Sequence, residues 1–293
     1  MLEGGRKTGA LTKDFDTDIP VITIVTVVYN AEQEIEETIK SIIGQTYKNI
    51  EYIVIDGDSS DNTLDILKKY ENKIDYWLSE KDNGIYDAMN KAINLAKGDW
   101  INFMNAGDSF VNKTIVSTMF SDGCSGDSEV IYGDNYYIKN DNKVLQKTRD
   151  LSFFYKGMPF NHQSCFVKAD LMKEKKFSDY RYDIQCEYLF LYQLYLEGKV
   201  FKKVDCIVAN YLADGFSDNN FIQRSVERFL INERFGVKNE ETRLHYVTLI
   251  SRHLNKSISI ENTNRLKNNK LIMPFVIVHR YLKRIILKYK TIK

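Results

Sequence analysis

The chain has 293 residues, of which 43% are hydrophobic and 28% are charged. This length and composition are typical of a soluble globular protein with one sizeable core and a smaller appendage. Its 41 basic and 40 acidic side chains leave a formal charge of +1, so no global electric field points to nucleic acid as a partner. The four cysteines (Cys124, Cys165, Cys186 and Cys206) lack the paired spacing of a zinc or redox site, and a reduced, cytoplasmic chain is expected.

Residues 1–18 form the N-terminal segment and contain no apolar run. Neither a signal peptide nor a membrane anchor is therefore expected there. The composition of this segment predicts a loosely ordered tail.

Strands and helices alternate from residue 21 to residue 104. The β-branched run at 21–28 predicts a strand that is covered on both faces. The other expected strands are 49–56, 73–80 and 100–104, and the expected helices are 29–46, 59–70 and 82–99. Asn30 and Asp61 are predicted helix caps, while Gly44 and Gly98 are predicted stops.

This alternation predicts a parallel sheet with right-handed crossovers. In such sheets, ligands bind beyond the carboxyl ends of the strands. The polar turns at 29–30, 56–58 and 105–108 are expected to converge there and form a site.

Beyond residue 110 the pattern is less regular. Residues 129–148 resemble a hairpin, and 158–177 resemble a strand that leads into a helix. An apolar helix is expected to end at Gly198, and the signals from about residue 215 are helical. We therefore predict a catalytic domain at 19–214 and a helical extension at 215–293.

The sequence contains neither a G-x-G-x-x-G fingerprint nor a P-loop, which argues against a dinucleotide-binding fold and against a P-loop protein. Four other motifs carry the functional signal. They are "VTVVYNAE", "VIDGDSSDNT", "EKDNGIYDAMNKAI" and "NFMNAGD". In order and spacing they resemble the family 2 glycosyltransferases of the GT-A fold, over about residues 20–110. The resemblance implies a Rossmann-like, mostly parallel α/β sheet flanked by helices, a nucleotide-sugar donor and transfer with inversion.

The resemblance also implies a set of nucleotide contacts. The matching residues are Thr26, Val28, Tyr29, Glu32, Asp56, Asp82, Gly84, Asn90 and Asn105. Structural alternatives exist for some acidic and amide residues, since Asp58 suits a turn and Asp61 a helix cap. Equally, Asp82 or Asn83 could cap a helix, and Asn90 could lie on its solvated face.

The family's metal turn carries two or three acidic residues that hold Mn2+ or Mg2+ against the donor diphosphate. In "NFMNAGD", Asn105 and Gly107 replace the first two acids and Asp108 matches the last. A hard divalent ion often takes only one or two ligands from protein, so Asp108 is the predicted metal ligand. The structural alternative is that Asp108 or Ser109 caps a following turn.

Inversion requires a general base opposite the leaving group. The family places an acidic residue near the start of a late helix, and Glu187 in "CEYLFLYQL" matches it best, with Asp183 as the competitor. Either residue could instead favour the helix dipole. His162 and Gln163 match a segment near the donor or acceptor sugar, although a core histidine is the plain alternative. For Asp134 we favour a turn.

The segment 262–293 is basic and amphipathic, with apolar residues at helical spacing from Pro274 onward. It could lie on an anionic membrane surface, or pack on the catalytic domain or on a second subunit as a homo-oligomer. Charged residues interrupt it too often for a membrane span.

The resemblance implies a metal-dependent inverting glycosyltransferase that moves a UDP-linked hexose or aminosugar to a glycan or lipid-linked saccharide acceptor, by analogy in surface polysaccharide biosynthesis. Its expected location is cytoplasmic or peripheral on the cytosolic face of the membrane. A sugar nucleotidyltransferase is the enzymatic alternative, but it would want a basic phosphate loop where "YNAEQEIEE" is acidic. A non-catalytic glycan-binding or assembly subunit is the second alternative, favoured by the reduced metal turn.

Overall fold

The computed structural model describes residues 1–6, 15–16, 18–120, 126–140, 142–177, 182–213, 220–236, 240–246 and 248–250. The chain divides into two compact units, Met1–Val237 and Lys238–Lys293. All elements and sites below belong to the first unit. None of its described helices is both long enough and apolar enough to cross a membrane.

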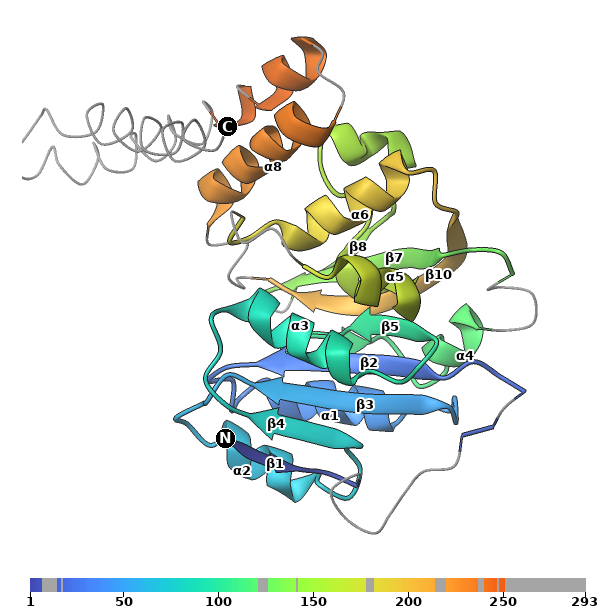
Figure 1. Ribbon diagram of the computed structural model, residues 1–293, viewed down its shortest axis with the longest axis vertical. Helices are drawn as coiled ribbons and strands as arrows, with labels where there is room; N and C mark the ends of the chain where they lie inside the picture. Colours follow the sequence, from blue (N-terminus) through green and yellow to red (C-terminus); the bar gives the residue numbers. More distant parts are fainter. Residues whose placement is uncertain are drawn as a thin grey trace, which may run out of the picture. The chain divides into compact units, whose positions relative to one another are not determined.

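Four parallel strands form the first half of the sheet, in the spatial order β4-β3-β2-β5. They are β2 (Ile22–Val28), β3 (Ile50–Asp56), β4 (Tyr76–Ser79) and β5 (Trp100–Phe103). The crossover helices are α1 (Ile35–Ile43), α2 (Thr63–Lys69) and α3 (Ile85–Leu95). The first two helices lie on one face and α3 on the other (Figure 1). The predicted alternation of strands and helices is confirmed, and the strand order reverses between β2 and β5, where such sheets bind ligands.

The second half of the sheet is mixed. From β5 outward the order is β9-β7-β10-β6, with β8 paired to β7. The strands are β6 (Ser109–Phe110), β7 (Val130–Lys139), β8 (Asn142–Gln146), β9 (Cys165–Lys168) and β10 (Phe201–Leu212). Among these, β7 and β8 form the predicted antiparallel hairpin, and β9 leads into a helix as expected. The sequence analysis missed β6 and β10.

The remaining helical elements surround this second half. They are α4 (Ile115–Met119), η1 (Leu151–Tyr155), η2 (His162–Ser164), α5 (Ala169–Lys175), α6 (Cys186–Leu196) and α8 (Phe221–Phe235). The apolar face of α1 supplies Ile35, Ile39 and Ile42, all nearly fully buried, to a core that includes Ile24 of β2. This burial fixes α1 against the sheet, because the apolar residues of a helix must find a partner surface.

The N-terminal segment is more ordered than predicted. Strand β1 (Leu2–Gly4) pairs antiparallel with β4, and Arg6 Nη2 lies 2.7 Å from Asp75 Oδ1. The prediction of a loosely ordered tail is therefore wrong for residues 1–6. Three residues are too few to show strand periodicity, and what orders them is the free edge of β4.

The end of the first unit also differs from the predicted boundary at residue 214. Helix α8 belongs to this unit, where the Glu227 carboxylate accepts the backbone N–H groups of Asp183 (3.2 Å) and Ile184 (2.9 Å). Asn232 Nδ2 donates to Tyr188 Oη at 2.7 Å. These bonds fasten α8 to the start of α6. The basic segment 262–293 lies outside the described residues.

Three local predictions are corrected. Asn30 does not cap α1, which begins at Ile35, because the Asn30 side chain accepts the backbone N–H of Ser60 at 2.8 Å. Asp134 lies within β7 rather than in a turn, and its Oδ1 accepts the backbone N–H of Thr148 at 2.8 Å. Asp61 accepts the backbone N–H of Thr63, the first residue of α2, at 3.0 Å, although the N-cap residue of this helix is Asn62 and not the predicted Asp61.

Candidate active site

The polar turns after β2, β3 and β5 meet at one edge of the sheet. The backbone N–H of Gly57 donates to Val28 O at 3.0 Å, and that of Ala106 donates to Val27 O at 3.3 Å. Parallel pairing of the three strands brings their carboxyl ends together, so turns up to 80 residues apart become neighbours. This convergence is the one predicted from the sequence.

Tyr29 and Asp82 lie over Gly57 at this edge. A Cβ atom on Gly57 would come within 2.6 Å of Asp82 Oδ2 and 3.4 Å of Tyr29 Cδ2. The Tyr29 side chain is 64% exposed. Asp82 Oδ1 accepts the backbone N–H of Gly84 at 2.8 Å, and Gly84 has a φ of 110°, a conformation that favours glycine. The turn at 82–84 thus presents a carboxylate beside an exposed aromatic ring, an arrangement that can take a nucleoside.

Asp56 and Thr26, which were also matched to nucleotide contacts, have their polar groups engaged inside the protein. Asp56 is fully buried, and its carboxylate accepts the hydroxyls of Ser59 (2.5 Å) and Ser79 (2.6 Å). The Thr26 hydroxyl, also buried, donates to Met104 O at 2.8 Å. These internal hydrogen bonds stabilise the turns that follow β2, β3 and β5.

Three further residues matched to nucleotide contacts also make contacts within the protein, namely Val28, Glu32 and Asn90. Val28 is 5% exposed in β2, and Glu32 Oε2 accepts Asn62 Nδ2 at 2.7 Å near the start of α2. Asn90 is 8% exposed, so the alternative of a solvated helix face is wrong. Its amide donates to Phe177 O at 3.0 Å and accepts the Phe177 N–H at 2.9 Å. Both ends of the Asn90 amide therefore hold one backbone position.

Asp108 links three elements that are distant in sequence. The side chain is buried, and its Oδ2 accepts Gln163 Nε2 at 2.9 Å while Oδ1 accepts the backbone N–H of Leu212 at 3.0 Å. The carboxylate therefore joins the turn after β5 to η2 and to the end of β10. The bond to Gln163, a predicted sugar contact, could not be foreseen from residues 55 positions apart.

The turn at 105–108 carries two oxygen-bearing side chains, Asn105 and Asp108, that could hold a divalent metal ion. Asn105 Oδ1 is buried and has no hydrogen-bond partner. The Asp108 oxygens accept the bonds described above from Gln163 and Leu212, and a carboxylate is the kind of oxygen ligand that a hard divalent ion takes. In the described part of the chain, no group of three or more His, Cys, Asp or Glu side chains could hold a metal. The turn therefore suits an ion that takes most of its ligands from diphosphate and water.

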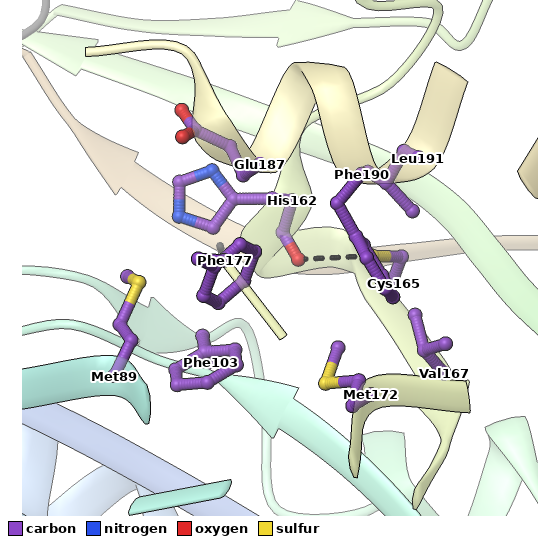
Figure 2. A pocket seen from close by; sticks show the side chains of 10 residues that line it. All are labelled: Met89, Phe103, His162, Cys165, Val167, Met172, Phe177, Glu187, Phe190 and Leu191. Carbon is purple, nitrogen blue, oxygen red and sulfur yellow. Dashed lines mark hydrogen bonds between the residues drawn. The ribbon is translucent and has the colours of Figure 1, made fainter. Parts of the chain in front are cut away.

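A second cluster lies between α6, η2 and β5. Figure 2 shows a pocket in which the Glu187 carboxylate and the His162 ring lie side by side among apolar groups. The apolar and sulfur-containing lining residues are Met89, Phe103, Cys165, Val167, Met172, Phe177, Phe190 and Leu191. Burial raises the pKa of Glu187, and burial lowers the pKa of His162 to about 4. Part of His162 reaches the surface, but its Nε2 atom is buried without a partner.

Glu187 and Asp183 have different surroundings, although both stand near the start of α6. Asp183 is exposed, and its Oδ2 accepts Gln223 Nε2 at 3.2 Å. Glu187 is partly buried and accepts a hydrogen bond from the hydroxyl of Tyr86. Tyr86 is not among the site residues predicted from the sequence, although it stands within the motif "DNGIYDAMNKAI".

A family model described as glycosyl transferase family 2 matches residues 23–177, which is more than half of the chain. The chain belongs to glycosyl transferase family 2. The matched range includes the three polar turns and, from the second cluster, His162 and its neighbour Gln163. Glu187 lies beyond it.

Curated relatives of this family 2 chain include glycosyltransferases from mycobacteria. An uncharacterized glycosyltransferase of Mycobacterium tuberculosis is 38% identical over 102 residues, which are 34% of this chain and 39% of the relative. The chain thus matches about two fifths of the length of that relative. A PGL/p-HBAD biosynthesis glycosyltransferase of Mycobacterium bovis is 25% identical over 225 residues, which are 75% of this chain and 88% of the relative.

Solved structures establish the fold of this family 2 chain as GT-A. The Staphylococcus aureus TarS fragment 1–349 in complex with UDP has a TM-score of 0.57 and 21% identity, covering 86% of this chain and 76% of that one. The mannosyltransferase PcManGT from Pyrobaculum calidifontis, in complex with GDP-Man and Mn2+, has a TM-score of 0.59 and 15% identity, covering 94% and 83%. The predicted fold is confirmed.

Proposed function

We propose that the chain is an inverting glycosyltransferase that uses a nucleotide-sugar donor, with Glu187 as its general base. The main support is the dipeptide His162-Gln163. His162 lines the pocket of Glu187, and Gln163 donates to Asp108 in the metal turn at 2.9 Å. The short helix η2 therefore contacts both the pocket of the proposed base and the proposed leaving-group site. Transfer of a sugar requires these two sites to be held close together.

In the proposed reaction, the acceptor oxygen attacks the anomeric carbon and its proton passes to Glu187. The bond from that carbon to the diphosphate breaks, and its electron pair leaves with the nucleoside diphosphate. A partly buried carboxylate with a raised pKa suits this task, because a base works best when its pKa approaches the working pH.

Mn2+ or Mg2+ is the proposed cofactor, and it would neutralise the charge that develops on the departing diphosphate. Asp108, the predicted metal ligand, and Asn105 Oδ1, which is buried without a hydrogen-bond partner, are the protein groups proposed to hold it. The GDP-Man and Mn2+ bound to PcManGT support a divalent ion at this fold's donor site.

The proposed nucleoside contacts are Tyr29, Asp82 and Gly84 around the open face of Gly57. A UDP-linked hexose or aminosugar is the proposed donor, since TarS structures hold UDP and UDP-GlcNAc. A hydroxyl of a glycan or lipid-linked saccharide in surface polysaccharide biosynthesis is the proposed acceptor. His162 is the proposed sugar contact, with Gln163 acting through Asp108.

The test is release of nucleoside diphosphate from a panel of UDP- and GDP-sugars, with Mn2+, with Mg2+ or with EDTA. We expect one donor to turn over in the presence of a metal and EDTA to abolish turnover. Formation of a nucleotide sugar from a nucleoside triphosphate and a sugar phosphate would indicate a nucleotidyltransferase instead.

A non-catalytic glycan-binding subunit remains the second candidate, favoured by the hydrogen bonds that Asp108 accepts from Gln163 and Leu212 inside the protein. Calorimetry with UDP and GDP separates it from the enzyme. Tight nucleotide binding without turnover of any donor would support the non-catalytic role.

A further inference from the structure

Tyr86 follows the turn that carries the proposed nucleoside contacts Asp82 and Gly84, and it contacts the proposed base Glu187. It lies in the first turn of α3, two residues after Gly84, and its side chain is 9% exposed. Its ring packs against Phe177 with centroids 5.6 Å apart. Its hydroxyl donates to Oε2 of Glu187, 101 residues further along the chain. Nothing in the family match or in the relatives assigns a role to this residue.

This hydrogen bond selects one carboxylate oxygen. A bond from a hydroxyl to a carboxylate is charge-assisted and strong in a buried setting. It occupies Oε2 and restricts rotation of the Glu187 side chain, which leaves Oε1 as the oxygen available to an acceptor hydroxyl. A base held in one orientation loses less entropy when it meets its substrate.

We propose that Tyr86 is a positioning residue that holds Glu187 in its proton-accepting orientation. The proposal rests on the proposed function, in which Glu187 is the base. Because Tyr86 follows the turn at 82–84 directly, the same helix start that carries the proposed nucleoside contacts also orients the base. The proposed donor site and the proposed base are therefore coupled through the first turn of α3.

The charge environment of Glu187 determines how loss of the hydroxyl would act. The titratable and charged groups that face Glu187 from other elements are Tyr86 on α3, His162 on η2, Cys165 on β9, and Arg224 and Arg228 on α8. Burial, the largest effect, favours the neutral form of Glu187, whereas the bond from Tyr86 and the two arginines favour the carboxylate. Removing the hydroxyl therefore raises the pKa of Glu187 further.

The first test measures the titration of Glu187 in the free protein, by carbon NMR of side-chain carboxyls labelled with 13C. The Glu187 signal is identified by its loss in Glu187→Gln. In Tyr86→Phe, which keeps the ring contact with Phe177, we expect the midpoint to move to higher pH. An unmoved midpoint would overturn the proposal.

Tyr70→Phe is the matched control. The Tyr70 hydroxyl also donates to a glutamate, Glu36 Oε1, at 2.7 Å, but on the surface between α1 and α2. We expect this variant to leave the Glu187 midpoint and the turnover rate at wild-type values. A shift as large as that in Tyr86→Phe would show a general effect of losing a tyrosine hydroxyl and would contradict the assignment.

The second test is kinetic. Tyr86→Phe should lower kcat by about 10-fold, a part of the 10²–10⁴ that a general base contributes, while KM for the donor stays within about twofold and the acid limb of the pH profile moves upward. A lower thermal midpoint with an unmoved acid limb would mean a purely structural role and overturn the proposal. If the wild type turned over no donor, the proposed function would fail, and the NMR titration would still decide whether Tyr86 orients Glu187.

Discussion

At the scale of single residues, Glu187 and Asp183 illustrate how burial separates two carboxylates that look equivalent in sequence. Asp183 is exposed, whereas Glu187 is held beside His162 in an apolar pocket. Burial raises the pKa of Glu187, which brings it closer to the working pH of a general base. No shift of this kind is needed for a carboxylate that only favours a helix dipole.

Replacement of Glu187 by Gln should lower kcat at least about 100-fold, because an amide cannot take the acceptor proton. The affinity for the nucleoside diphosphate, measured by calorimetry, should change less than twofold. Asp183→Asn is the control and should retain activity within about twofold. The opposite pattern, with Asp183→Asn inactive and Glu187→Gln active, would transfer the role of base to Asp183.

His162 should make stability depend on pH. Burial lowers its pKa to about 4 from the ordinary value of 6.5, so between these values the unfolded chain binds more protons than the folded one. The corresponding stability is fully present above pH 6.5 and is lost as the pH falls toward 4. Urea unfolding of wild type and His162→Gln across this window should show the steeper acid loss in the wild type. Equal slopes would mean that the folded protein does not hold the imidazole neutral.

At the scale of elements, α8 fixes the chain just before α6. The Glu227 carboxylate is 3% exposed and accepts the two backbone N–H groups of Asp183 and Ile184. Those two residues precede the helix that carries Glu187. The position of the proposed base therefore depends on a helix more than 30 residues further along the chain.

Glu227→Ala should destabilise the protein by about 1–3 kcal/mol, since it leaves two backbone donors without their acceptor. It should also lower kcat, because the start of α6 is released. Chemical denaturation and steady-state kinetics measure the two effects. Glu36→Ala, which removes a carboxylate between α1 and α2, is the control for kcat. Unchanged turnover in Glu227→Ala would separate α8 from the site.

Some strands can be predicted from the local sequence pattern, whereas others are defined by hydrogen bonds to strands that are distant in sequence. The buried strands from β2 to β5 consist mostly of apolar or β-branched residues, so their pattern can be recognised in the local sequence. In β10 the residues Lys202, Lys203 and Asp205 interrupt the apolar pattern, and β6 has only two residues. Pairing between these strands, rather than periodicity, defines them.

The same distinction holds for the site. The places of Tyr29, Asp82 and Glu187 in the fold were predictable, because each lies next to the end of a strand or helix that the sequence pattern indicates. The roles of Asn90 and Asp108 depend on Phe177 and Gln163, which lie 87 and 55 residues away. A contact of that separation has no local signature, and only the folded chain brings the partners together.

At the scale of the whole molecule, the basic segment 262–293 is proposed to bind an anionic membrane surface. The full chain should float with vesicles that contain phosphatidylserine, and a variant without residues 262–293 should not. Binding should weaken as the salt concentration rises, since surface charges are screened. Equal flotation of both chains would remove the membrane proposal, and a change of oligomeric state on truncation would favour pairing with a second subunit.

Transfer with inversion requires a single displacement at the anomeric carbon, with Glu187 as the proposed general base. The most direct measurement is proton NMR of the transferred sugar during turnover of an α-linked nucleotide sugar. We expect the first product signal to be the β-anomer, and Glu187→Gln to suppress its appearance. A first product with the α configuration would contradict direct displacement and the role of Glu187 as the general base.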